Sequence, residues 1–243
     1  AGPGERGGAS GAGTLPDEAP AAGGGEPQAD DATYSVQELF GLVRDRLYGV
    51  PVGDREARRE DLLRTRFRLP VNRVRVAPSK IHGRGVFATR RIAADELVTV
   101  YPGDAIRFYP STPEGVAETR CGVLFGHHLP EALRDPRAVM STYRPFSYDV
   151  DGLYALVGLP DLAADPAYAG HMVNDASTCG ADIADQETYR KRNPPQCNAT
   201  FEGLLDAAVA IVASKPIEEG EEVLAAYGAE YWADLAVAAV PTA

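Results

Sequence analysis

The sequence predicts a mostly-β or α+β domain that is preceded by N-terminal helices. Apolar residues recur with helical spacing chiefly before residue 70. From residue 71 onward, short apolar segments are separated by turn residues, as expected of strands. The regular βαβ alternation of a dinucleotide-binding sheet is not found in the sequence. The larger part of the chain is therefore expected to fold into short strands with few helices.

The N-terminal residues 1–33 differ in composition from the rest of the chain. They contain six acids, one base and a run of three glycines at 23–25. Because such a segment buries too little apolar surface to offset its ordering entropy, we expect a disordered leader rich in Gly, Ala and Pro. The remaining residues suffice for a single hydrophobic core.

Helices are expected within residues 34–70. Residues 35–38 have the form of a helix capping box, and apolar residues then recur with helical spacing until Gly49. A second helix is predicted over residues 54–67. Farther along the chain, a short helix is expected near 130–133, and residues 181–192 are expected to be helical before two prolines interrupt them.

Strands are predicted in order along residues 71–232. The segments concerned are 74–76, 85–89, 97–101, 148–150, 153–157, 208–213 and 222–226. The dipeptide Asp151-Gly152 lies between two of these segments and favours a two-residue hairpin. A turn at 218–220 is expected between the last two. Residues 233–243 are interpreted as a C-terminal tail.

The formal net charge of −11 is unevenly distributed. Residues 51–91 hold twelve bases against four acids, whereas the chain from residue 92 onward holds nine bases against twenty-three acids. The acidic part favours a basic partner, and contact of the basic stretch 51–91 with nucleic acid stays open. Three cysteines are too few for a disulfide scaffold, and histidines and cysteines lack the spacing of metal ligands. No apolar run approaches a membrane span, so we expect a soluble, intracellular protein without a metal.

Three segments carry the functional signal. The first, Gly83-Arg84-Gly85 before a strand, allows the backbone to pass close to a ligand, but no third glycine and no helix follow to cradle a phosphate. The second, residues 170–176, contains Asn174-Asp175, a pair that by itself indicates an ordinary turn. The third, residues 211–228, reads as strand, turn and strand and ends in Tyr227 followed by a glycine. Each segment alone is weak.

In this order, the three segments resemble those of SET-domain protein lysine methyltransferases, over residues 71–232. The resemblance implies a SET-domain fold with a knot-like C-terminal threading, and S-adenosyl-L-methionine as the cofactor. It also implies the roles of individual residues. The expected cofactor-binding residues are Gly83, Arg84, Gly85, Tyr148, Asn174 and Asp175. The expected catalytic residues are Tyr227 and Tyr101, and the expected substrate channel is formed by Phe201, Tyr231 and Trp232.

The resemblance further implies methylation of lysine in a basic protein or peptide, for which a histone tail is expected, and hence a nuclear protein. An alternative is a non-catalytic SET-fold module that binds basic peptides. Asp175-Ala176 favours the alternative because the family usually has His-Ser there, whereas the intact Tyr227 opposes it. Residues 177–196 are interpreted as an insertion that shapes a substrate groove, and no cysteine follows Trp232 to form a zinc cap. The target lysine and the number of methyl groups are left open.

Overall fold

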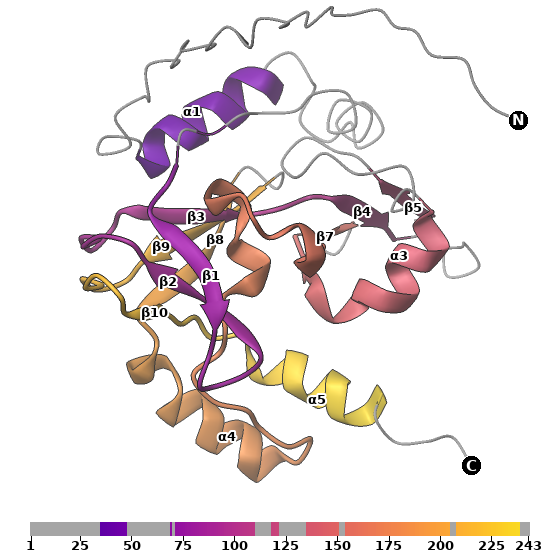
Figure 1. The fold of residues 1–243 in the computed structure, drawn as a ribbon. Coiled ribbons are helices and arrows are strands. Elements are labelled where there is room, and N and C mark those ends of the chain that lie inside the picture. The colour runs from indigo at the N-terminus through magenta and orange to yellow at the C-terminus, as the bar shows by residue number, and fades with distance from the viewer. Residues whose placement is uncertain are drawn as a thin grey trace, which may run out of the picture.

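The computed structural model describes residues 35–47, 69, 71–109, 118–121, 135–150, 154–204 and 208–238. These residues form three small antiparallel sheets with a few helices around them, as the sequence predicts (Figure 1). The expected leader and the helices predicted over 54–67 and near 130–133 lie outside the described residues. In the described part of the chain, no helix combines the length and the apolar character needed to cross a membrane.

The first sheet has the order β1-β2-β10 and contains the glycine segment. It consists of β1 (Val74–Pro78), β2 (Arg84–Ala88) and β10 (Glu222–Val223). The turn between β1 and β2 closes with a hydrogen bond from the Ser79 amide to the Gly83 carbonyl, 3.0 Å long, and Gly83 takes a left-handed φ of 49°. Because Val223 pairs with Val86, the last of the three segments lies beside the first.

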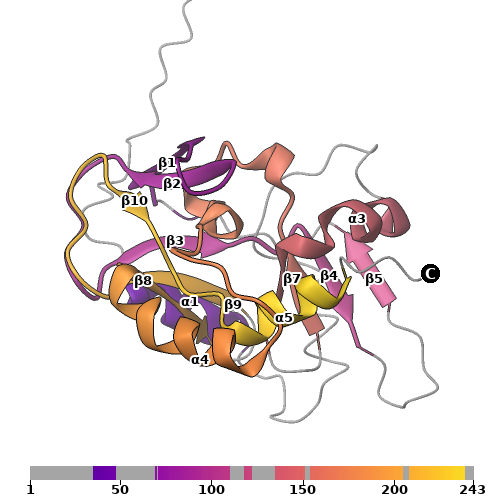
Figure 2. The same ribbon diagram turned by 90° about the horizontal axis from the view of Figure 1, so that it is seen from below.

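The second sheet has the order β3-β9-β8 and supplies most of the core. It consists of β3 (Leu97–Tyr101), β9 (Ala208–Ala213) and β8 (Ala199–Leu204). Every residue of the central strand β9 is buried, in keeping with its continuous apolar sequence. The first sheet lies over one face of the second, so that Val86, Val100 and Ile211 share one core (Figure 2).

The third sheet has the order β5-β4-β7-β6. It consists of β4 (Ala105–Phe108), β5 (Glu118–Cys121), β6 (Ser147–Asp149) and β7 (Tyr154–Val157). The antiparallel pairing of β6 with β7 agrees with the two strands expected there, whereas the predicted two-residue turn at Asp151-Gly152 lies outside the described residues. Helix α3 (Pro136–Tyr143) packs beside this sheet through a small apolar cluster that includes Val139 and Leu159. The sequence reading had missed β4, β5, β8 and α3.

Three further helices flank the sheets. In α1 (Val36–Leu47), the capping box forms as predicted, with Ser35 and Glu38 bonded to each other's backbone amides. Helices α4 (Ile183–Arg192) and α5 (Ala229–Ala238) lie together at the opposite end of the molecule (Figure 1). Helix α5 runs across residue 232, where the SET-like segment was expected to end. Single 3-10 turns occupy Arg144–Phe146, Pro160–Leu162, Pro166–Tyr168, Gly170–Met172 and Pro194–Gln196.

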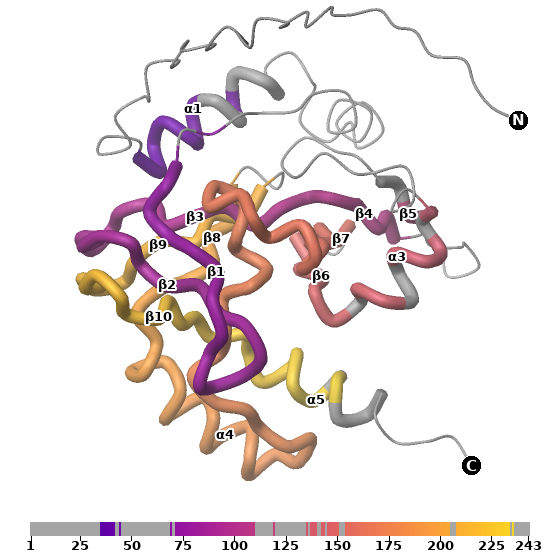
Figure 3. The backbone as a smooth tube through the Cα atoms, in the orientation of Figure 1, coloured from indigo at the N-terminus to yellow at the C-terminus, as the bar shows by residue number. Residues whose placement is uncertain are grey.

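After β9 the chain leaves the second sheet and enters the first (Figure 3). The predicted turn at 218–220 therefore joins strands of different sheets rather than a hairpin. Beyond β10, Leu224 forms a parallel bridge with Asn174, and Ala225 forms one with Ala199. These bridges bring the last segment between the middle segment and β8. The knot-like threading itself stays a prediction.

Candidate functional site

A cavity of about 1000 Å³ lies where the three sequence segments meet. Ten of the eleven predicted site residues line it: Gly83, Arg84, Tyr101, Tyr148, Asn174, Asp175, Phe201, Tyr227, Tyr231 and Trp232. The eleventh, Gly85, is not among the lining residues. The fold thus brings together side chains that are more than a hundred residues apart in the sequence, from β2, β3, β6, β8 and α5.

Two tyrosines, the buried Tyr101 and the partly buried Tyr227, direct their hydroxyl protons to main-chain carbonyls of the cavity wall. The Tyr101 hydroxyl donates to the Phe146 carbonyl and the Tyr227 hydroxyl donates to the Val173 carbonyl, each at 2.6 Å. Burial is the main cause that raises the pKa of both phenols well above the ordinary value of 10.0. Both hydroxyls therefore stay protonated, and their oxygens keep free lone pairs.

The aromatic rings around the cavity form a continuous chain. The Tyr148 ring lies 5.6 Å from Tyr101 and 5.3 Å from Phe201, centroid to centroid. The Phe201 ring lies 6.2 Å from Tyr227, whose ring stacks on Trp232 at 5.7 Å. Tyr231 meets Tyr227 edge to face at 4.8 Å. A pocket with such walls presents the negative faces of several rings, which suits a cation or a desolvated alkyl chain.

Asn174 ties the first segment to the last. Its amide nitrogen lies 3.1 Å from the carbonyl oxygens of His82 and Arg84 and 2.9 Å from the Glu222 carboxylate. This explains Gly85, because a Cβ atom there would meet the Glu222 carboxylate and the Asn174 amide. The absence of a side chain at Gly85 therefore leaves room for this contact, and the expected role of Gly85 in binding the cofactor stays a prediction.

Asp175 has a role that the sequence reading missed. Its side chain is buried, and its Oδ2 atom accepts hydrogen bonds from the Tyr227 amide at 2.9 Å and from the Trp232 indole at 3.0 Å. The Tyr189 hydroxyl donates to the same atom. The sequence reading expected Asp175 to act through its backbone. That contact stays a prediction, and the Asp175 carboxylate in addition connects the middle segment, the catalytic candidate Tyr227 and α5.

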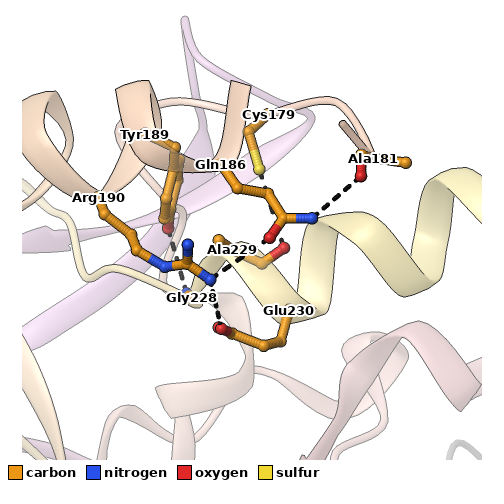
Figure 4. Close-up of polar contacts among 8 residues, drawn as sticks. All are labelled: Cys179, Ala181, Gln186, Tyr189, Arg190, Gly228, Ala229 and Glu230. Atoms are coloured by element: carbon orange, nitrogen blue, oxygen red, sulfur yellow. Dashed lines mark hydrogen bonds and ion pairs between the residues drawn. The ribbon is translucent and has the colours of Figure 1, made fainter. Parts of the chain in front are cut away.

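The expected insertion, residues 177–196, packs against the site. Tyr189 of α4 is buried, and its hydroxyl also accepts a hydrogen bond from the Gly228 amide at 3.2 Å (Figure 4). Farther out, Arg190 pairs with Glu230 of α5 at 2.7 Å. Ser177 and Thr178 line the cavity. No sequence signal marked Tyr189, because its partners lie in other segments.

Other parts of the cavity wall were also missed. His171 is buried there, with its ring 6.3 Å from Tyr101 and 6.4 Å from Phe146, an arrangement typical of a structural histidine. The carbonyls of Phe146 and Val173 carry no sequence signal, since every residue has one. Arg84 reaches the Pro160 carbonyl at 3.3 Å and Tyr231 reaches the Pro145 carbonyl at 3.1 Å. Within the described residues, no three His, Cys, Asp or Glu side chains cluster as metal ligands would.

Residues 83–228, which make up more than half of the chain, match the SET domain. A search of curated proteins gave no match. Among solved structures, the chain is similar to a Plasmodium falciparum protein described as a "putative histone methyltransferase", at 15% identity and a TM-score of 0.35, over 66% of this chain and 97% of that one. By its match to the SET domain over residues 83–228, the chain belongs to the SET-domain family.

Proposed function

We propose that this protein is an S-adenosyl-L-methionine-dependent protein lysine N-methyltransferase. The observation that carries the proposal is the pair of tyrosines, Tyr101 and Tyr227, whose hydroxyl protons are both directed to carbonyls of the cavity wall. Their oxygens are thereby restricted to accepting hydrogen bonds. Lined by acceptors and aromatic faces, the cavity favours a sulfonium cation and an amine donor over an anion.

The residues present fit the cofactor. The backbone around Gly83 is fixed by the Asn174 amide, which donates to the carbonyls on either side of it, and would hold the polar groups of S-adenosyl-L-methionine. Tyr101 and Tyr148 would contact its charged sulfur region, and a cavity of about 1000 Å³ is of the size that holds a small molecule. When bound, the cofactor supplies an electrophilic methyl group on a sulfonium.

The substrate lysine must lose its charge before it attacks. At neutral pH this costs roughly 4 kcal/mol for a free lysine of pKa about 10.4. The rings of Phe201, Tyr227, Tyr231 and Trp232 lower this cost by withholding water from the ammonium form. Tyr227 orients the amine by accepting one of its N–H groups. Because burial raises the pKa of Tyr227, the phenol is not the base that removes the lysine proton.

We further propose that the substrate is a basic protein segment, with a histone tail as the first candidate, and that the protein then acts in the nucleus. The excess of acids after residue 92 supports a basic partner. The alternative of a non-catalytic module rested on Asp175. The bonds to the Asp175 carboxylate give this departure from the family a structural reason, which favours the enzyme. Contact of residues 51–91 with nucleic acid stays a prediction.

The test is transfer of a labelled methyl group from S-adenosyl-L-methionine to core histones and to nucleosomes. The Tyr227→Phe variant is measured alongside, because it removes the oxygen that would orient the amine and leaves the ring in place. We expect label on a histone with the wild-type protein and a fall in turnover of about a hundredfold or more with Tyr227→Phe.

Cofactor binding by calorimetry serves as the control, since Tyr227→Phe should bind S-adenosyl-L-methionine as the wild type does. Wild-type protein that binds the cofactor without labelling histones would contradict the histone assignment. Wild-type protein that neither binds the cofactor nor labels histones would favour the peptide-binding module.

A further inference from the structure

We propose that Tyr189, in the insertion, is a positioning residue that fixes the catalytic candidate Tyr227 through the buried Asp175 carboxylate. The inference rests on the proposed methyl transfer, and it assigns to the insertion a task in turnover in addition to the expected shaping of a groove. Its basis is the set of hydrogen bonds that meet at one carboxylate oxygen, together with the position of Tyr189 outside the cavity lining.

The Tyr189 hydroxyl serves two partners at once. As a donor it reaches Asp175 Oδ2, and as an acceptor it receives the Gly228 amide at 3.2 Å. Figure 4 shows the Tyr189 side chain extending from α4 toward Gly228. The residue that follows Tyr227 is thus attached to α4 by its backbone, and Tyr227 itself is attached to Asp175 by its own amide. The backbone amide of Tyr227 is therefore held by the Asp175 carboxylate, and the backbone amide of Gly228 is held by the Tyr189 hydroxyl.

The same carboxylate also positions the Trp232 ring, which stacks on the Tyr227 ring. Trp232 donates its indole N–H to Asp175 Oδ2 at 3.0 Å, and its ring stacks on Tyr227 with an interplanar angle of 18°. The buried Asp175 carboxylate therefore holds both the backbone amide of Tyr227 and the indole ring that stacks on one face of Tyr227. Hydrogen bonds to a charged group are stronger than neutral ones, and their loss inside a protein is costly. With its backbone and ring held in this way, Tyr227 directs its hydroxyl group to the Val173 carbonyl in a fixed orientation.

Tyr189 acts through Asp175 and Gly228, because it does not line the cavity. Its removal should therefore lower turnover without weakening the binding of substrate or cofactor. A residue with a merely structural role would lower stability and leave the turnover of the folded protein unchanged. This difference separates the two roles.

The chain provides a direct spectroscopic signal for the arrangement. Trp232 is its single tryptophan, so tryptophan emission reports on the one indole that is bonded to Asp175. In Tyr189→Phe, we expect Trp232 emission to shift to longer wavelength and to be quenched more strongly by acrylamide. We expect kcat to fall about ten- to a hundredfold, with KM and the Kd for S-adenosyl-L-methionine unchanged.

The matched control is Tyr143→Phe, which deletes the same atom from a tyrosine bonded to Asp161 at 2.6 Å rather than to Asp175. It should leave Trp232 emission unchanged. Asp175→Asn disturbs the same hydrogen bonds from the other side and should reproduce the emission shift, so it carries the test if Tyr189→Phe does not fold. In the double variant, the shift should be less than the sum of the two single shifts.

Unchanged emission and unchanged kcat in folded Tyr189→Phe would overturn the inference, as would a rise in KM without a fall in kcat. The measurement of Trp232 emission does not require that the protein has methyltransferase activity. If the wild-type protein transfers no methyl group, the proposed function fails, while the Trp232 signal still decides whether Tyr189 holds this arrangement through Asp175.

Discussion

Asn174 and Asp175 are adjacent and both buried, yet their side chains connect opposite parts of the site. The Asn174 amide donates to the glycine segment and to Glu222, all of which belong to the three sequence segments. The Asp175 carboxylate accepts from Tyr227 and α5 and from Tyr189 of the insertion. The difference teaches that the three motif segments alone hold the Asn174 side of the cavity, whereas the side around Tyr227 also depends on the insertion and on α5, which lie outside the motifs.

The largest effect is expected from breaking the Asn174 side with Gly85→Ala. The added Cβ would meet the Glu222 carboxylate and would lie 2.9 Å from the Asn174 amide nitrogen. Overpacking of this kind costs about 1–3 kcal/mol of the free energy of unfolding. The Asn174 bonds would be displaced with it, so we also expect the affinity for S-adenosyl-L-methionine to fall at least about tenfold. Denaturant unfolding and calorimetry measure the two effects.

Gly203→Ala is the matched control, because a Cβ at Gly203 meets nothing within 4 Å. Its unfolding free energy should stay within about 0.5 kcal/mol of the wild type, with cofactor affinity unchanged. Equal behaviour of the two variants would remove the role assigned to the space at Gly85.

We expect the two tyrosines attached to Asp175, Tyr189 and Tyr227, to make the folded protein less stable at alkaline pH. Burial, followed by the hydrogen bond to Asp175, raises the pKa of Tyr189, and burial raises that of Tyr227. Well below pH 10 both phenols are protonated in the folded and the unfolded chain, and at about pH 10 half of each phenol is ionised in the unfolded chain. Above it the unfolded chain loses protons that the folded chain keeps, so the free energy of unfolding falls by up to about 1.4 kcal/mol per pH unit for each phenol.

Urea unfolding at a series of pH values measures this slope, and Tyr189→Phe should reduce it by the share of one phenol. A free energy of unfolding that stays constant above pH 10 would mean that the folded protein does not raise the pKa values of these phenols.

The smallest effect is expected from Arg190→Ala. Its ion pair with Glu230 also joins α4 to α5, but the two side chains are 49% and 77% exposed. An exposed pair contributes about 0.5 kcal/mol or less, so stability and turnover should change little. Urea unfolding is the measurement. A loss above about 2 kcal/mol would show that the surface pair, rather than Tyr189 and Asp175, holds α4 in place.

Much of the fold followed from local patterns. The capping box of α1, the hairpin of β6 and β7 and the apolar run of β9 each carry their signal within a few neighbouring residues. The missed strands β5 and β8, with the sequences ETRC and ATFEGL, contain few apolar residues, and β4 has only four residues, so none of them carries a strong local signal. Helix α3 had a signal that was overlooked: Asp135 precedes Pro136 and accepts from the Arg137 amide at 3.0 Å.

The site shows the same division. Tyr101, Tyr227 and Asn174 could be named because they lie in recognisable segments, and the structure places them around one cavity. Tyr189 could not, since nothing in a polar helix distinguishes the tyrosine that meets Asp175 fourteen residues earlier. The Asp175 carboxylate was missed for a related reason, because its three partners come together only when the insertion and α5 fold against the middle segment.

The most direct test compares calorimetric titration of S-adenosyl-L-methionine into the wild type, Gly85→Ala and Tyr189→Phe. If the Asn174 side holds the cofactor and the Asp175 side holds Tyr227, wild type and Tyr189→Phe will bind with similar affinity, and Gly85→Ala will bind at least about tenfold more weakly. Binding that is lost in Tyr189→Phe and retained in Gly85→Ala would contradict this division of the site.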